Sequence, residues 1–90
     1  MAGYHIRDIP RGECGDVSKI MEEVRELEDA IEQGVRIMQL CELSDIIQAI
    51  RLNLRKHHPG VTLDDLIQMA DVTERAFADG TRVDRNSVKS

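Results

Sequence analysis

The chain is poor in aromatic residues, cysteine and long apolar runs. Its 90 residues include one Tyr, one Phe and no Trp, which favours an aliphatic core and helix-on-helix packing over a sheet. Two cysteines, Cys14 and Cys41, are too few for a disulfide framework, and no basic-then-apolar signal pattern opens the sequence. No apolar run approaches the roughly 20 residues that span a bilayer. We therefore expect a soluble, cytoplasmic protein with no membrane partner.

The chain also lacks an excess of positive charge. Its formal net charge is -5 and its pI is about 5.1. Nonspecific binding to nucleic acid depends on Lys and Arg side chains that neutralise phosphates, so this class of partner is not expected. A ligand that carries phosphate would need a bridging cation. The length indicates one small domain, whose apolar core must be small or shared with a partner.

Apolar spacing and turn residues predict an all-α fold. We expect three main helices, over about 16–33, 35–57 and 62–79, in an antiparallel helical bundle completed by oligomerisation. Gly34, Pro59 and Gly80 mark the ends of these helices. Thr62 and Asp65 have the spacing of a capping box. The domain organisation is then an irregular N-terminal arm (1–15), the helical domain (16–79) and a polar, mobile C-terminal tail (80–90).

The first predicted helix has two distinct faces. An apolar stripe, expected to face the core, consists of Val17, Ile20, Met21, Val24, Leu27 and Ile31. A second stripe, about 120° away, carries Lys19, Glu23, Glu26 and Ala30. The remaining charged residues, namely Arg25, Glu28, Asp29 and Glu32, read as ordinary solvated side chains.

The second predicted helix is the most apolar segment. Its aliphatic residues cover an arc too wide for a simple surface helix, which indicates burial against more than one neighbour. These residues are Ile37, Leu40, Leu43, Ile46, Ile47, Ile50 and Leu54. A narrow polar stripe on the same helix holds Glu42, Asp45, Ala49, Asn53 and Lys56. Cys41 lies at the edge of the apolar arc, where a buried free thiol is the simpler interpretation than a metal ligand.

The three histidines each have a possible structural role and a possible functional role. His5 lies between Tyr4 and Ile6, and packing of this group against the bundle is the simpler explanation than a position over a ligand. His57 and His58 end the second helix, where exposure is favoured over metal ligation or pH sensing, because adjacent residues do not share a helix face.

Four acidic residues stand at mirrored positions about Gly34. If the chain reverses there, Glu23 lies opposite Asp45 and Glu26 opposite Glu42. Like charges that converge must raise their pKa values or bind cations. Carboxylate oxygens suit Mg²⁺ or Mn²⁺, which would polarise a phosphoryl oxygen and activate water. Four further residues are candidates for substrate binding: Lys19 and Lys56 for phosphate, Asn53 for a sugar or base, and Glu22 beside the acidic face.

These acids also carry a family resemblance. Glu22-Glu23-Val24-Arg25-Glu26 and, further along, Glu42-Leu43-Ser44-Asp45 resemble the Glu-x-x-Glu … Glu-x-x-Asp signature of the all-α nucleoside triphosphate pyrophosphohydrolases. That superfamily includes MazG, the dimeric dUTPases and the phosphoribosyl-ATP pyrophosphohydrolases. The resemblance covers about residues 15–80. Small members are frequent in phage genomes, so a phage origin, with function in the host cytoplasm, is compatible with this size.

The resemblance implies a specific activity and assembly. It implies a Mg²⁺-dependent hydrolase that cleaves a (d)NTP substrate to (d)NMP and pyrophosphate with a metal-activated water. Glu23, Glu26, Glu42 and Asp45 match the motif as catalytic metal ligands. A homo-oligomer, dimer or tetramer, is also implied. Two alternatives remain: a non-catalytic helical protein-interaction module, and a hydrolase of a phosphoribosyl or signalling nucleotide. Many relatives have longer flanks that recognise the base, so the residues do not define substrate identity.

Overall fold

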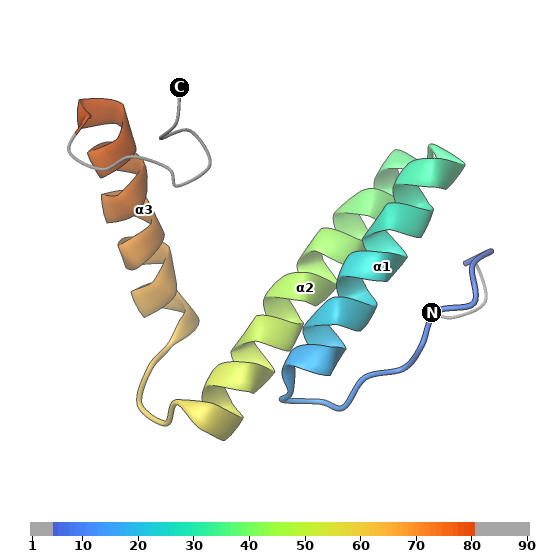
Figure 1. Cartoon of the computed structure of the whole chain (residues 1–90), viewed down its shortest axis with the longest axis horizontal. Helices are drawn as coiled ribbons and strands as arrows, with labels where there is room; N and C mark the ends of the chain where they lie inside the picture. The colour runs from blue at the N-terminus through green and yellow to red at the C-terminus, as the bar shows by residue number, and fades with distance from the viewer. Residues whose placement is uncertain (1–4, 81–90) are drawn as a thin grey trace, which may run out of the picture. The chain divides into compact units, whose positions relative to one another are not determined.

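The computed structural model describes residues 5–80, and this part of the chain is helical without any strand. The helices are α1 (Val17–Gln33), α2 (Arg36–His57) and α3 (Leu63–Asp79) (Figure 1). Their bounds fall within one residue of the predicted ranges, so the all-α fold with three helices is confirmed. The expectations for Tyr4 and for the tail beyond residue 80 lie outside the described residues.

The chain divides into two compact units, Met1–Gly60 and Val61–Ser90. The first contains α1 and α2, which lie side by side and antiparallel (Figure 1). Gly34 reverses the chain between them with a φ of 74°, in the left-handed region that glycine adopts without strain. Its N–H donates to the carbonyl oxygens of Ala30 and Ile31, which caps α1. The tight reversal fixes which residues of the two helices lie at the same level.

The second unit is described by itself and contains α3. A capping box begins this helix, as the sequence predicted. The Thr62 hydroxyl accepts a hydrogen bond from the Asp65 N–H at 3.1 Å, and the Asp65 carboxylate accepts one from the Thr62 N–H at 2.9 Å. Gly80 ends the helix. None of the three helices has the length and apolar character of a transmembrane span within residues 5–80.

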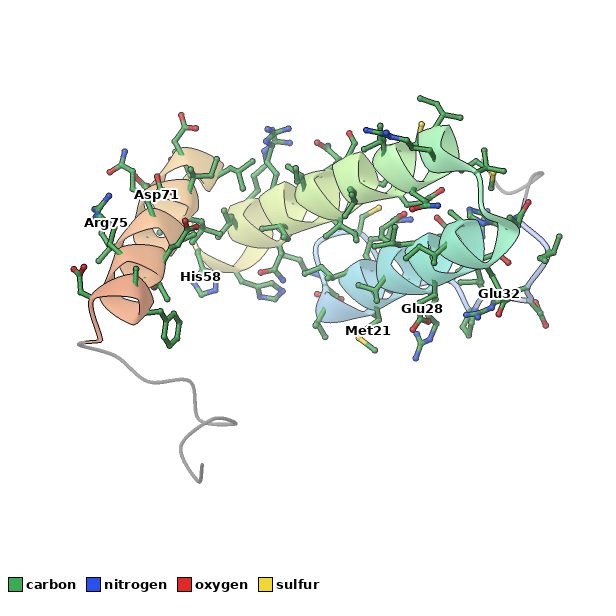
Figure 2. The ribbon with its side chains drawn as sticks, turned by 90° about the horizontal axis from the view of Figure 1, so that it is seen from above. Met21, Glu28, Glu32, His58, Asp71 and Arg75 are labelled. Atoms are coloured by element: carbon green, nitrogen blue, oxygen red, sulfur yellow. The ribbon has the colours of Figure 1, made fainter. Side chains whose placement is uncertain are left out.

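The prediction that the apolar stripe of α1 faces the core is wrong. Val17 is 66% exposed and Ile31 is 56% exposed, and Figure 2 shows the Met21 side chain pointing away from α2. The acidic side of α1 is buried instead, together with Ala30. The physical reason is that Ala30 and, on α2, Ala49 are small enough for close helix approach. The Gly12 N–H and the Lys19 ammonium group compensate part of the buried carboxylate charge. The apolar stripe is therefore left on the outside of the hairpin.

The apolar arc of α2 is likewise exposed over much of its width. Ile37, Leu40, Leu43 and Ile47 are 46% to 66% exposed, and Leu54 is buried. Within residues 5–80, burial of this arc against more than one neighbour is therefore not found. Cys41 is exposed, so the expectation of a buried thiol is wrong. The exposure of Cys41 has the same cause as the exposure of the apolar arc, because the side of α2 next to this arc faces outward.

Residues 5–15 form neither helix nor strand, and they contact the hairpin through their backbone. The Gly12 N–H donates to Glu22 Oε1 at 2.8 Å. A Cβ atom at Gly12 would lie 2.2 Å from the carbonyl oxygen of Ser18, a separation that no side chain tolerates. Glycine is thus required for this segment to approach the first turn of α1. The contact places residues 5–12 against the acidic side of the helix.

Candidate metal centre

Four carboxylates from α1 and α2 converge between the helices. Glu23, Glu26, Glu42 and Asp45 each offer an oxygen, and these oxygens lie within 4.8 Å of one another. We call these residues the four-acid set. Glu42 is fully buried and Glu23 is 6% exposed, whereas Asp45 is exposed. The structure brings together the residues that the mirrored spacing about Gly34 predicted to meet. Their roles as metal ligands stay a prediction.

Mutual repulsion within the four-acid set shifts two pKa values upward. Burial and the neighbouring Glu23 carboxylate raise the pKa of Glu26 to about 7, and Glu42 adds to the effect. Burial, together with the Glu23 and Glu42 charges, raises the pKa of Asp45 above its usual value. A divalent cation among these oxygens would reverse both shifts. The set therefore has the electrostatic character of a cation site.

One lysine compensates part of this charge. Lys19 Nζ lies 3.2 Å from Glu22 Oε1 and 3.2 Å from Glu23 Oε2. Burial alone would lower the pKa of Lys19, but the two glutamates raise it above its ordinary value. The other oxygen of Glu23, Oε1, is buried and accepts no hydrogen bond within the described part of the chain. A single ammonium group thus leaves a buried carboxylate oxygen without a donor.

A cavity of about 270 Å³ opens beside the acids. Its lining combines two cations with carboxylates: Arg11, Lys19, Glu22, Glu23, Glu26 and Asp45. Lys19 lines this cavity, and its role in phosphate binding stays a prediction. Arg11 is not among the predicted residues, because no periodicity links residues 1–15 to the helices. A larger hollow of about 550 Å³ lies along α3, but among the described residues that line it Asp65 alone is charged. The polar cavity is the better candidate for a phosphate-bearing ligand.

The other predicted substrate-binding residues make structural contacts. Asn53 donates a hydrogen bond from Nδ2 to the Gly15 carbonyl oxygen at 3.0 Å. Lys56 Nζ and His57 Nε2 lie 2.9 and 3.1 Å from Asp16 Oδ1, just before α1. These contacts join the start of α1 to the end of α2. Both histidines that follow Lys56 are exposed, as predicted.

Glu22 is also engaged in a structural contact. It is 8% exposed and accepts hydrogen bonds from the Gly12 N–H and from Lys19. Burial opposes ionisation, but these donors lower the pKa of Glu22 below its usual value. Glu22 therefore stays ionised and fixes residues 5–15 on α1. This position favours a role in holding the cavity wall over one in contacting substrate.

The interpretation of Asp29 as a solvated side chain is wrong, because this residue is completely buried. Its carboxylate accepts hydrogen bonds from the N–H groups of Ile6 and Arg7 and from Gln33 Nε2, and it lies 2.7 Å from His5 Nδ1. Burial opposes ionisation, but the His5, Gln33 and backbone donors lower the pKa of Asp29. Its spacing of three from Glu26 was the available signal that it shares the buried side.

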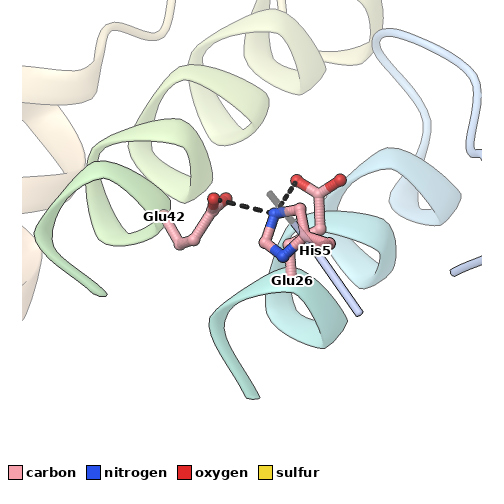
Figure 3. A group of neighbouring side chains, drawn as sticks. All are labelled: His5, Glu26 and Glu42. Atoms are coloured by element: carbon pink, nitrogen blue, oxygen red, sulfur yellow. Dashed lines mark hydrogen bonds and ion pairs between the residues drawn. The ribbon is translucent and has the colours of Figure 1, made fainter. Parts of the chain in front are cut away.

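His5 packs against the hairpin, which agrees with the structural interpretation of this residue. Its side chain is 4% exposed, and Nε2 lies 3.1 Å from Glu42 Oε2 and 3.8 Å from Glu26 Oε1 (Figure 3). Burial alone would lower the pKa of His5, but the bond to Asp29 and the two glutamate charges raise it. Ile6, by contrast, is 71% exposed and does not pack. Sequence reasoning did not link His5 to the acids because 18 or more residues separate it from them.

Comparisons with known proteins identify no relative. No family model matches the sequence, no curated protein matches it, and no solved structure matches the fold. The geometry of the described residues and the motif in the sequence are therefore the basis for assigning a function.

Proposed function

We propose that the protein is a Mg²⁺-dependent nucleotide pyrophosphohydrolase of the MazG-like class, with Mn²⁺ as a substitute ion. It would convert a (d)NTP to a (d)NMP and pyrophosphate. The observation that carries this proposal is the convergence of Glu23, Glu26, Glu42 and Asp45 within 4.8 Å, in the order and spacing of the family signature. The polar cavity next to them provides room for a phosphate chain.

The four-acid set fits a hard divalent cation. All four ligand groups are carboxylates, which Mg²⁺ and Mn²⁺ accept. Glu23 Oε1 is buried and accepts no hydrogen bond from the described residues. Burial and the nearby Glu23 and Glu42 carboxylates raise the pKa of Glu26 to about 7, and a bound cation would oppose this shift. When bound, the ion would supply charge neutralisation for phosphate oxygens and activation of water.

The chain's own residues supply the remaining functions. Lys19 and Arg11 line the cavity and can bind phosphate oxygens, which gives an acidic protein a local positive contribution for an anionic ligand. Glu26 belongs to the four-acid set and also lines the cavity, so its carboxylate can orient a water molecule or accept a proton from it. The proposed cleavage chemistry can therefore draw on residues of α1, α2 and the segment that precedes them.

Product analysis tests the activity. The protein is incubated with Mg²⁺ or Mn²⁺ and a panel of NTPs, dNTPs, phosphoribosyl nucleotides and signalling nucleotides, and the products are separated by chromatography. We expect a nucleoside monophosphate and pyrophosphate in equal amounts. Release of orthophosphate from an NTP contradicts the proposed cleavage position. Thermal stabilisation by Mg²⁺ with turnover of only a phosphoribosyl or signalling nucleotide identifies the alternative hydrolase. Neither stabilisation nor turnover identifies an interaction module.

The outward apolar faces support a homo-oligomer. Met21 and Val24 on α1, and Leu40 and Ile47 on α2, are 37% to 50% exposed and belong to continuous stripes. Exposed apolar surface of this extent usually marks an interface. We infer that a second copy covers these stripes and completes an antiparallel bundle, as a dimer or a tetramer. The acids would then lie inside each hairpin and the subunit contact outside it.

A charged substitution on the outer face should dissociate the oligomer. Leu40→Lys places an ammonium group in the proposed interface, and burying an unpaired charge is costly, so we expect the dissociation constant to rise by at least about tenfold. Size-exclusion chromatography with light scattering over a concentration series measures it. Gln68→Lys, an exposed position on α3, is the charge-matched control. A wild-type protein that is monomeric at every concentration contradicts the inference.

A further inference from the structure

The segment before α1 carries an imidazole into the space between the helices. His5 is held with Nδ1 against Asp29 and Nε2 against Glu26 and Glu42 (Figure 3). The two glutamates come from different helices, and Glu42 is fully buried. Three donors from three separate parts of the chain therefore meet at one point. Both glutamates also belong to the four-acid set.

Asp29 determines which ring nitrogen of His5 carries a hydrogen. Every other group bonded to this buried carboxylate is a donor: the N–H groups of Ile6 and Arg7, and Gln33 Nε2. Asp29 is therefore an acceptor, and His5 Nδ1 donates its hydrogen to Oδ2 at 2.7 Å. Nε2 is then the ring nitrogen directed at the glutamates. Without an ion it forms a hydrogen bond with Glu42 Oε2 at 3.1 Å, and a bound ion would take the place of that hydrogen. A histidine whose other nitrogen donates to a carboxylate is the usual arrangement for a metal-ligating imidazole.

The separation between His5 and Glu42 matches that between neighbouring ligands of one ion, and the separation between His5 and Glu26 is longer. Ligands at roughly 2.1 Å from a metal are about 3.0 Å apart at octahedral angles and about 3.4 Å apart at tetrahedral angles. His5 Nε2 lies 3.1 Å from Glu42 Oε2 and 3.8 Å from Glu26 Oε1. One donor atom from each of the three residues falls within 4.8 Å of the others. Beside them, the buried Oε1 of Glu23 accepts no hydrogen bond from residues 5–80.

We propose that His5, Glu26 and Glu42 form a second metal position, which prefers a transition-metal ion such as Mn²⁺, Fe²⁺, Co²⁺ or Zn²⁺ over Mg²⁺. Imidazole nitrogen suits these ions, whereas Mg²⁺ prefers oxygen donors. The position adjoins the four-acid set and shares Glu26 and Glu42 with it, so it rests on the proposed metal centre but not on the hydrolytic activity. Asp29 acts as a positioning residue that orients the imidazole.

Metal titrations of matched histidine variants test this proposal. Wild type, His5→Asn and His57→Asn are titrated with Co²⁺, followed by its visible absorption, and with Mg²⁺ by calorimetry. We expect His5→Asn to weaken Co²⁺ binding by at least about tenfold and to change Mg²⁺ binding by less than about threefold. His57→Asn should change neither, because His57 is exposed and contacts Asp16. Asp29→Asn, which keeps the imidazole but replaces its carboxylate acceptor by a neutral amide, should weaken Co²⁺ binding by about 10-fold to 100-fold.

Three outcomes overturn the proposal. Unchanged Co²⁺ affinity in His5→Asn shows that the imidazole is not a ligand, and increased affinity shows that His5 competes with the ion instead. X-ray absorption of the Co²⁺-loaded wild type must show imidazole scattering, and its absence also overturns the proposal even if His5→Asn fails to fold. Failure of the proposed function has a different result: Mg²⁺ binds or Co²⁺ binds through His5, yet no nucleotide is cleaved.

Discussion

Glu42→Gln is expected to reduce the rate of Mg²⁺-dependent pyrophosphate release by a factor of at least about 100. The substitution keeps the shape of a side chain that is fully buried, but it replaces a charged oxygen donor of the four-acid set by a neutral amide. Steady-state rates with the preferred nucleotide measure the effect. Glu28→Gln on the outer side of α1 is the matched control, because its side chain is 59% exposed, and it should keep the wild-type rate.

The same variant separates loss of a ligand from loss of the fold. Glu42 adds to the repulsion that raises the pKa values of Glu26 and Asp45, so its neutralisation should leave the metal-free protein at least as stable as wild type. Mg²⁺ should raise the melting temperature of wild type but not that of Glu42→Gln. Thermal unfolding with and without Mg²⁺ measures both effects. Full activity in both Glu42→Gln and Asp45→Asn would exclude the proposed site.

Mg²⁺ affinity should depend steeply on pH below neutrality. Glu26 has a pKa of about 7 in the metal-free protein, raised by burial and by Glu23, and a bound cation requires its ionised form. Each pH unit below 7 should therefore weaken Mg²⁺ binding by up to about tenfold, and above pH 7 the dependence should flatten. Calorimetry in two buffers with different ionisation enthalpies gives the affinity and the number of protons released. Glu26→Gln identifies the contribution of this carboxyl.

The raised pKa of Glu26 weakens Mg²⁺ binding at acid pH but stabilises the metal-free protein there. Its folded-state pKa is above the ordinary value of 4.5, so the folded form binds the proton more tightly. The resulting stabilisation is fully present below pH 4.5 and is lost as the pH rises through 7. His5, Glu23 and Glu42 face the same carboxyl, and the lowered pKa of Asp29 acts in the opposite direction at acid pH. The unfolding midpoint of Glu26→Gln relative to wild type should fall with decreasing pH. A constant difference between pH 5 and pH 8 would contradict this assignment.

The fold and the meeting of four acids were predictable because both depend on local rules. Helix limits followed from Gly34, from the Thr62 capping box and from Gly80. Once the reversal at Gly34 is fixed, helical geometry determines that Glu26 and Glu42 lie at one level. These inferences need only spacing within a helix and one turn. They needed no knowledge of which face of each helix is buried.

The orientation of the helices was not predictable from periodicity. An apolar stripe indicates a buried face in most soluble helices, yet Val17 and Ile31 are exposed, and the single hairpin buries charged groups instead. The burial of Asp29 depends on N–H donors from Ile6 and Arg7, which are more than 20 residues away and in a segment without regular structure. Contacts of this kind leave no period in the sequence.

Because the hairpin has a small apolar core, its measured stability depends on the concentration of any ion or partner chain that binds the folded form. Ala30, Ala49 and Leu54 are the buried apolar residues within residues 5–80, so a single chain gains little free energy from removing apolar surface from water. An ion or a second copy that binds only the folded form adds to that free energy, by about 2.7 kcal/mol at a concentration 100 times its dissociation constant. Melting temperatures of variants are therefore comparable only at equal protein and equal metal concentrations.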